Sequence, residues 1–161
     1  MFKRLMAALR RDGSKSSDGP ENIAALQDDV VRSVAADRTD LQDHEWEDRE
    51  WVHIAVNTEL LVEDGRRSST QTAVLAHKPG GELEDLDFRL SMATKAKILA
   101  LRNAMSASGN AVWTIVDITI ERDGVYKFSF GYGPPPRLNG DLLHAPLKGS
   151  LERYKAGRGL H

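Results

Sequence analysis

Residues 111–132 constrain the fold more than any other stretch of this chain. Residues 111–121 are rich in β-branched side chains, which fit a pleated, half-buried surface. Residues 125–132 alternate strictly between aromatic and small or polar side chains, with Asp123 and Gly124 between the two runs. An Asp-Gly pair predicts a two-residue type I′ turn. The stretch is therefore predicted to form an antiparallel hairpin, and its aromatic face must be covered because an isolated hairpin is marginal in water.

The aromatic face of this hairpin is open to two interpretations. Tyr126, Phe128, Phe130 and Tyr132 share one side of the strand and resemble a platform on which nucleic-acid bases stack. Such a platform interleaves Lys and Arg, whereas Lys127 points to the opposite side. We therefore favour a core face, with Phe128 and Phe130 buried against a helix.

Periodicity and turn signals predict the remaining elements. These are a helix from Pro20 to about residue 36, strands over residues 51–62 and 70–77, a helix over residues 88–105 capped by Asp85 or Asp87, a helix stop at residues 108–110, and a short helix from Pro146. The order of helix, hairpin, helix, hairpin and tail predicts an α+β fold. We expect a mostly antiparallel four-stranded sheet built from two hairpins, with the helices packed on one face.

The length of 161 residues suits one domain with loose ends. We expect a flexible basic tail over residues 1–19, a single domain over 20–156 and a frayed end over 157–161. The tail has a second interpretation as a short basic amphipathic helix that touches a membrane or nucleic acid. The chain has no cysteine and no apolar run long enough to span a membrane, so we expect a cytoplasmic protein without disulfides.

A search for catalytic or ligand-binding chemistry finds no motif. The five histidines are scattered along the sequence. Only His53 and His77 are predicted to lie on facing strands, where their side chains could come together. No G-x-S-x-G motif occurs, and the glycine pair at 131 and 133 leads into prolines instead of a helix. The many carboxylates are typical of solvated faces. We therefore expect no metal, no cofactor and no catalysis.

Two strings of this hairpin resemble the carboxy-terminal hairpin of YezG-type immunity proteins. They are Trp-Thr-Ile-Val-Asp-Ile-Thr-Ile at residues 113–120 and Asp-Gly-Val-Tyr-Lys-Phe-Ser-Phe-Gly-Tyr at residues 123–132. The upstream order of elements is also similar, so the resemblance covers roughly residues 20–141. It departs after the closing Tyr132, where Gly-Pro-Pro-Pro-Arg stands instead of acidic residues. The resemblance implies a non-catalytic protein that binds and neutralises a cognate toxin domain, often a nuclease.

The expected partner-binding groups are acidic side chains together with exposed aromatic and arginine anchors, which interfaces favour. Residues 37–50 concentrate acid around a tryptophan, although a solvated linker is the alternative for this segment. A net charge of −2 disfavours a nucleic-acid binder. The candidate contact residues are Glu45, Trp46, Glu47, Asp48, Tyr132, Arg137 and Asp141. The alternative functions are a small regulatory or homo-oligomeric module and an enzyme that uses carboxylates with His53 or His77.

Overall fold

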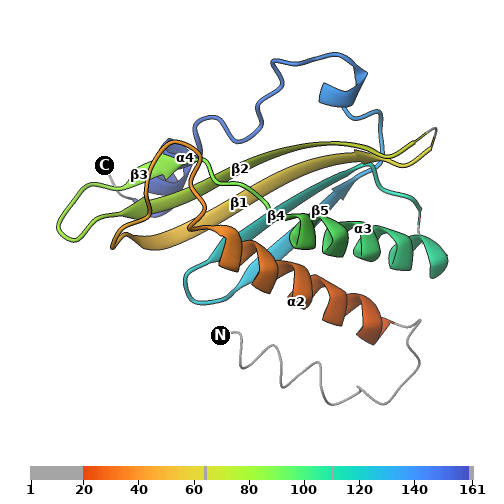
Figure 1. Cartoon of the computed structure of the whole chain (residues 1–161), viewed down its shortest axis with the longest axis horizontal. Coiled ribbons are helices and arrows are strands. Elements are labelled where there is room, and N and C mark those ends of the chain that lie inside the picture. The colour runs from red at the N-terminus through yellow and green to blue at the C-terminus, as the bar shows by residue number, and fades with distance from the viewer. Residues whose placement is uncertain (1–19, 64, 110, 160–161) are drawn as a thin grey trace.

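The computed structural model describes residues 20–63, 65–109 and 111–159 (Figure 1). Its elements in chain order are α2 (Pro20–Asp37), β1 (Glu50–Leu61), β2 (Arg67–His77), β3 (Glu84–Leu86), α3 (Met92–Ala107), β4 (Ile115–Glu121), β5 (Tyr126–Gly131), η1 (Arg137–Asn139) and α4 (Ser150–Gly157). The predicted tail over residues 1–19 lies outside the described residues, as do residues 160–161 of the predicted frayed end.

The strands form one five-stranded sheet in the order β3-β2-β1-β4-β5, and every neighbouring pair is antiparallel. Both predicted hairpins are present, and β1 pairs with β4 to join them. The α+β class is confirmed, but the expected count of four strands is wrong because β3 adds an edge strand to β2. The sequence predicts a helix start at these residues, with Asp85 or Asp87 as its cap. Leu86 is instead buried in the core, and Glu84 pairs with Arg49.

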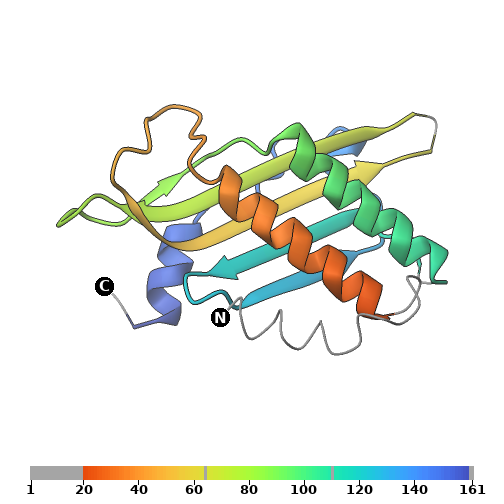
Figure 2. The same cartoon turned by 60° about the horizontal axis from the view of Figure 1, so that its bottom comes forward.

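The helices α2 and α3 cross one face of the sheet (Figure 2). The predicted span of α2 is confirmed, whereas α3 begins four residues later than expected, at Met92. Its cap is Ser91, whose side chain accepts a hydrogen bond from the Thr94 N–H, and neither Asp85 nor Asp87 serves as the cap. The predicted helix stop is confirmed, since Ser108 caps α3 and Gly109 has a φ of +88°.

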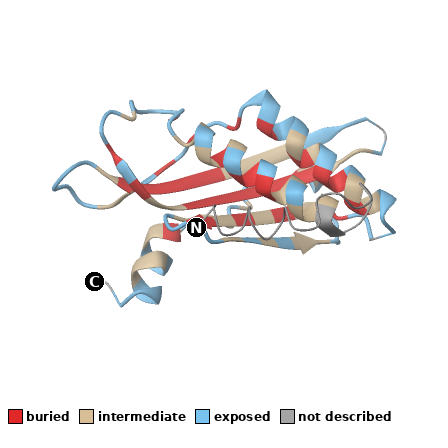
Figure 3. Cartoon of the chain, turned by 90° about the horizontal axis from the view of Figure 1, so that it is seen from below, coloured by how far each residue is buried: buried red, intermediate tan, exposed pale blue. Residues whose placement is uncertain are grey.

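The core lies between these two helices and the sheet (Figure 3). Its largest fully buried side chain is Trp113, which contacts the ring of Phe130 at a centroid distance of 5.5 Å. Phe128 and Phe130 pack against the core but are only partly buried, because β5 is the edge strand. The helix above this edge is α2, not the predicted second helix (Figure 2). The aromatic face therefore faces the core, as predicted, but it lies at the margin of that core.

The turn between β4 and β5 differs from the predicted type I′ turn. Glu121 N–H donates to the Val125 carbonyl at 2.8 Å, which leaves a three-residue loop. Gly124 has the predicted positive φ, +91°, but Asp123 does not, and a type I′ turn needs both. The Asp123 carboxylate instead accepts the Val125 N–H at 3.0 Å. The loop thus follows the pattern of a turn closed by a single left-handed glycine.

The chain after β5 returns across the other face of the sheet. We call residues 133–149 the strap; it contains η1 and leads into α4 (Figure 1). The last helix starts at Ser150 and not at Pro146, because Gly149 adopts a φ of +81° just before it. Tyr154 of α4 contacts the His53 ring at a centroid distance of 5.4 Å. None of the helices in the described part of the chain has the length and apolarity needed to cross a membrane.

Candidate partner-binding surfaces

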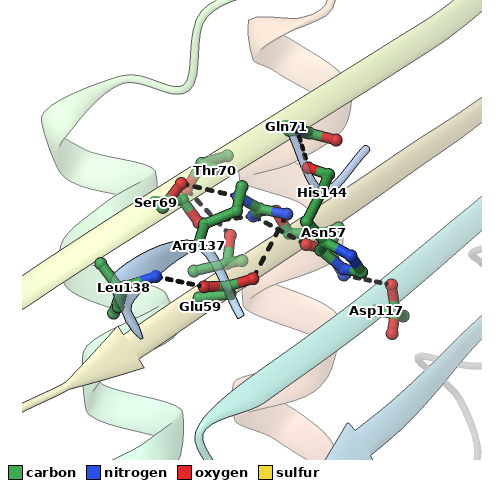
Figure 4. Close-up of polar contacts among 10 residues, drawn as sticks. Asn57, Glu59, Ser69, Thr70, Gln71, Asp117, Arg137, Leu138 and His144 are labelled. Atoms are coloured by element: carbon green, nitrogen blue, oxygen red, sulfur yellow. Dashed lines mark hydrogen bonds and ion pairs between the residues drawn. The ribbon is translucent and has the colours of Figure 1, made fainter. Parts of the chain in front are cut away.

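Polar side chains occupy the face of the sheet that lies under the strap. In β1, Asn57 and Glu59 alternate with the core residues Val56 and Leu60, so they point away from the helices. An uncovered carboxylate at such a position would be solvated. Glu59 is instead fully buried, with a relative exposure of 0%, because η1 of the strap lies over it (Figure 4).

Arg137 of η1 neutralises this buried carboxylate. Its guanidinium lies 3.4 Å from one Glu59 oxygen, and the other oxygen accepts the Leu138 N–H at 3.0 Å. A buried charge is tolerated only when it is paired and hydrogen-bonded, and here one short segment supplies both partners. The pair therefore fixes the strap to the carboxyl-terminal part of β1, the central strand of the sheet.

The rest of the Arg137 guanidinium is bound by neighbouring strands. It donates to Ser69 Oγ at 2.7 Å, to the Ser69 carbonyl at 3.0 Å and to Asn57 Oδ1 at 2.8 Å. Asn57 in turn donates to Asp117 Oδ1 at 2.8 Å. These groups hydrogen-bond one another, while Glu59 Oε2 and Arg137 Nη1 are joined as an ion pair without a hydrogen bond (Figure 4). The arrangement is a clamp, and the predicted exposure of Arg137 is wrong.

The strap presents an exposed apolar pair beyond the clamp. Leu142 and Leu143 are 80% and 91% exposed, far more than leucines in a packed loop. Their loop is held on one side by η1 and on the other by Gln71, whose amide donates to the His144 carbonyl at 2.9 Å. Asp141, a predicted contact residue, adjoins the pair and is exposed. These leucines give no signal in the sequence, because their loop has no repeating pattern.

Tyr132 is the predicted contact residue that follows β5. It is 53% exposed and so remains accessible to a partner. Its neighbour Gly133 accepts a hydrogen bond from the Thr114 hydroxyl through its carbonyl. Tyr132 therefore leads into the strap at a fixed position.

The acidic connection over residues 37–50 is an ordered segment, not a loose linker. Leu41 is buried and bridges to Phe88, and the buried Arg49 donates to Glu84 at 2.8 Å. Trp46 is half-buried against the core, with the Arg38 guanidinium 5.7 Å from its ring centroid. The predicted exposure of Trp46 is therefore only partly correct, and the alternative of a solvated linker is wrong for Leu41 and Arg49.

The acidic contact residues of this connection remain accessible. Glu45, Glu47 and Asp48 are exposed around Trp46. Figure 1 shows this connection at the opposite end of the sheet from η1, so the predicted contact residues form two separate groups. One group is the acidic connection; the other comprises Tyr132, where the chain enters the strap, and Asp141, next to the strap leucines.

The two histidines proposed for a catalytic alternative do not meet. His53 Nδ1 lies 2.8 Å from a Glu121 oxygen on β4, and His77 Nδ1 lies 2.9 Å from the Lys78 carbonyl. In the described ranges no three His, Asp or Glu side chains form a group able to hold a metal ion. That no metal binds stoichiometrically stays a prediction.

Comparisons with known proteins do not add an identification. No protein-family model and no curated protein matches the chain.

Proposed function

We propose that this chain is a non-catalytic cytoplasmic protein that binds and neutralises a cognate toxin domain, as the YezG-type resemblance implies. The observation that supports it is the exposed Leu142 and Leu143 pair on a clamped loop. Exposed leucines in adjacent positions are unfavourable in water, and an apolar patch on a fixed loop is typical of a protein contact.

The clamp explains how such a loop would bind without a large entropic penalty. Ordering a flexible loop on binding opposes association. Here the Glu59–Arg137 pair and the Gln71 hydrogen bond hold both ends of the loop before any partner arrives. The leucines then provide apolar anchors, and Asp141 and Tyr132 provide polar and aromatic contacts at their margin.

The acidic connection has a separate role in this proposal. A nuclease toxin carries a basic cleft because it holds phosphates. The exposed Glu45, Glu47 and Asp48 would attract such a cleft and raise the association rate, which depends on charge complementarity. The leucines would instead govern dissociation.

The experiment measures binding of the toxin domain encoded beside this gene by surface-plasmon resonance. The double variant Leu142→Ser/Leu143→Ser removes the apolar pair. The matched control is Val125→Ser, which removes an apolar side chain that is 46% exposed in a different loop. We expect the double variant to bind about 30-fold more weakly through faster dissociation, as for loss of a binding hot spot. The control should bind like the wild type.

The acidic role is tested in the same assay at two ionic strengths. Neutralising Glu45, Glu47 and Asp48 to their amides should slow association and flatten its salt dependence.

Equal binding by the leucine variant and the control would remove the loop from the interface. No toxin binding together with a wild-type dimer in sedimentation would favour the homo-oligomeric alternative.

A further inference from the structure

The outer edge of β2 is covered along only part of its length. The short strand β3 pairs with β2 at Val74, Leu75 and Ala76 (Figure 2). After β3 the chain turns away from β2. At Thr72 it is the side-chain hydroxyl, and not the strand backbone, that bonds to the N–H and carbonyl of Phe88. Residues 67–71 have no strand outside them among the described residues, and we call them the open edge.

Alternate residues of this open edge, Ser68 and Thr70, turn their backbone hydrogen-bonding groups outward. Leu60 N–H donates to the Thr114 carbonyl of the chain leading into β4 at 2.8 Å, so its backbone faces away from β2. Ser68 is the β2 partner of Leu60. Across an antiparallel pair of this kind the two backbones point away from each other, so the Ser68 N–H and carbonyl face out. Thr70, two residues further, has the same orientation.

A hollow adjoins the open edge on the helix side. Ser68 and Thr70 share this side with their partners Leu60 and Thr58, and as small residues they leave space beneath α3. The space has a volume of about 330 Å³. The apolar part of its lining consists of Leu60, Ile98 and Leu99. The exposed Arg66 and Lys95 form a basic rim.

Soluble proteins protect open edges with inward charges, prolines or bulges. The open edge reads Arg-Ser-Ser-Thr-Gln, and the side chains of its outward-facing residues are short hydroxyls. Arg67 is turned to the other face, where it donates to the Leu138 carbonyl at 3.4 Å. The edge thus combines backbone donors and acceptors that have no strand partner in the described part of the chain with an adjacent apolar hollow. These are the parts of a strand-addition site.

We infer that the open edge of β2 binds an extended peptide segment of a partner protein as an added antiparallel strand. The segment runs in line with β3. Its residues opposite Ser68 and Thr70 exchange backbone hydrogen bonds and place apolar side chains in the hollow. The next residue on that face lies beside Arg66 and carries a carboxylate, which complements the basic rim. The hollow lies on the helix side of this edge, whereas Arg67 and Gln71 of the same edge hold the strap on the other side. The inference does not rest on the proposed function.

The probe is a fluorescein-labelled peptide amide with the sequence Thr-Val-Thr-Val-Thr-Glu. Its two valines fall opposite Thr70 and Ser68, and its glutamate then falls beside Arg66. Binding to the full chain is measured by fluorescence polarisation up to about 1 mM protein, which covers weak affinities. N-methylation of either valine removes a donor to the edge, and should weaken binding about tenfold or more. N-methylation of the central threonine, whose N–H points away from β2, should leave binding unchanged.

The protein variant is Thr70→Pro, which removes an outward N–H and no hydrogen bond to β1. Thr70→Val is its matched control, because it also loses the hydroxyl bond to Thr58 but keeps the N–H. We expect about tenfold weaker binding for the proline variant and wild-type binding for the control. Circular dichroism checks that both fold. If Thr70→Pro does not fold, the N-methyl peptides decide the question on the wild-type chain.

Three results would overturn the inference. The first is the absence of saturable binding, and the second is equal binding by all the N-methyl peptides. The third is a wild-type chain that forms a dimer and does not bind the peptide, while Thr70→Pro is a monomer. The edge would then be occupied by a second copy of this chain.

Discussion

Removing the arginine from the buried Glu59–Arg137 pair should destabilise the protein strongly. In Arg137→Met the aliphatic stem is retained while the charge is lost, so Glu59, which is fully buried in the wild type, loses its counter-charge. Leaving one partner of a buried pair uncompensated costs about 3–5 kcal/mol. For a chain of this size that corresponds to a fall of about 10 °C in Tm. Urea denaturation followed by circular dichroism measures the change.

The double variant Glu59→Gln/Arg137→Met separates the charge effect from lost packing. The amide that Glu59→Gln introduces is neutral, and its carbonyl oxygen can still accept the Leu138 N–H, which Glu59 accepts at 3.0 Å. We therefore expect the double variant to be about 2 kcal/mol more stable than Arg137→Met alone. Arg67→Met is the control, since its guanidinium makes only a 3.4 Å contact with the strap, and should change stability by less than about 0.5 kcal/mol. A double variant less stable than Arg137→Met would refute the reasoning.

Three further predictions concern the sheet and its edges. Phe128→Ala should lose about 2–3 kcal/mol in urea denaturation, less than a fully buried phenylalanine, because β5 is an edge strand and the ring is only partly buried; an unchanged midpoint would show that the ring does not support the core. Gly124→Val should lose about 1–3 kcal/mol by the same measurement, since φ is +91° there, whereas Gly124→Asn should lose less; equal losses would contradict the turn. The hydrogen bond from Arg49 lowers the pKa of Glu84 from its ordinary value of 4.5, so the ionised carboxylate stabilises the fold above that pH and the stabilisation is lost as the pH falls through the lower folded value. Urea titrations at several pH values should therefore show a shallower acid loss for Glu84→Gln than for the wild type, and parallel curves would contradict this.

The hairpins and the first helix could be predicted because their signals are local. Pro20 marks the start of α2, Gly124 permits the second turn, and alternation along β1 separates Val56 from Asn57. These features depend on neighbours in the sequence. Periodicity and turn chemistry therefore capture them.

The elements that were missed depend on distant partners. The strand β3 is only three residues long and exists because it pairs with β2 and because Arg49 binds Glu84. The burial of Glu59 needs η1, whose arginine follows a proline run that gave no sign of crossing the sheet. The exposed strap leucines and the open edge likewise become visible only when the layers are assembled. Sequence patterns alone could therefore supply the scaffold but not the surfaces.

The position of Arg137 near the carboxyl end has a consequence for the order in which the chain folds. Glu59 is synthesised well before its counter-charge, and it lies on the central strand of a sheet whose other strands are all complete by Gly131. During synthesis a sheet can thus pair while this carboxylate is still in contact with water. Its dehydration must wait for the last quarter of the chain, and this long-range contact is of the kind that slows folding. A ribosome-bound chain that ends before η1 would therefore carry a hydrated negative charge on the central strand, on the face that the strap covers in the finished protein.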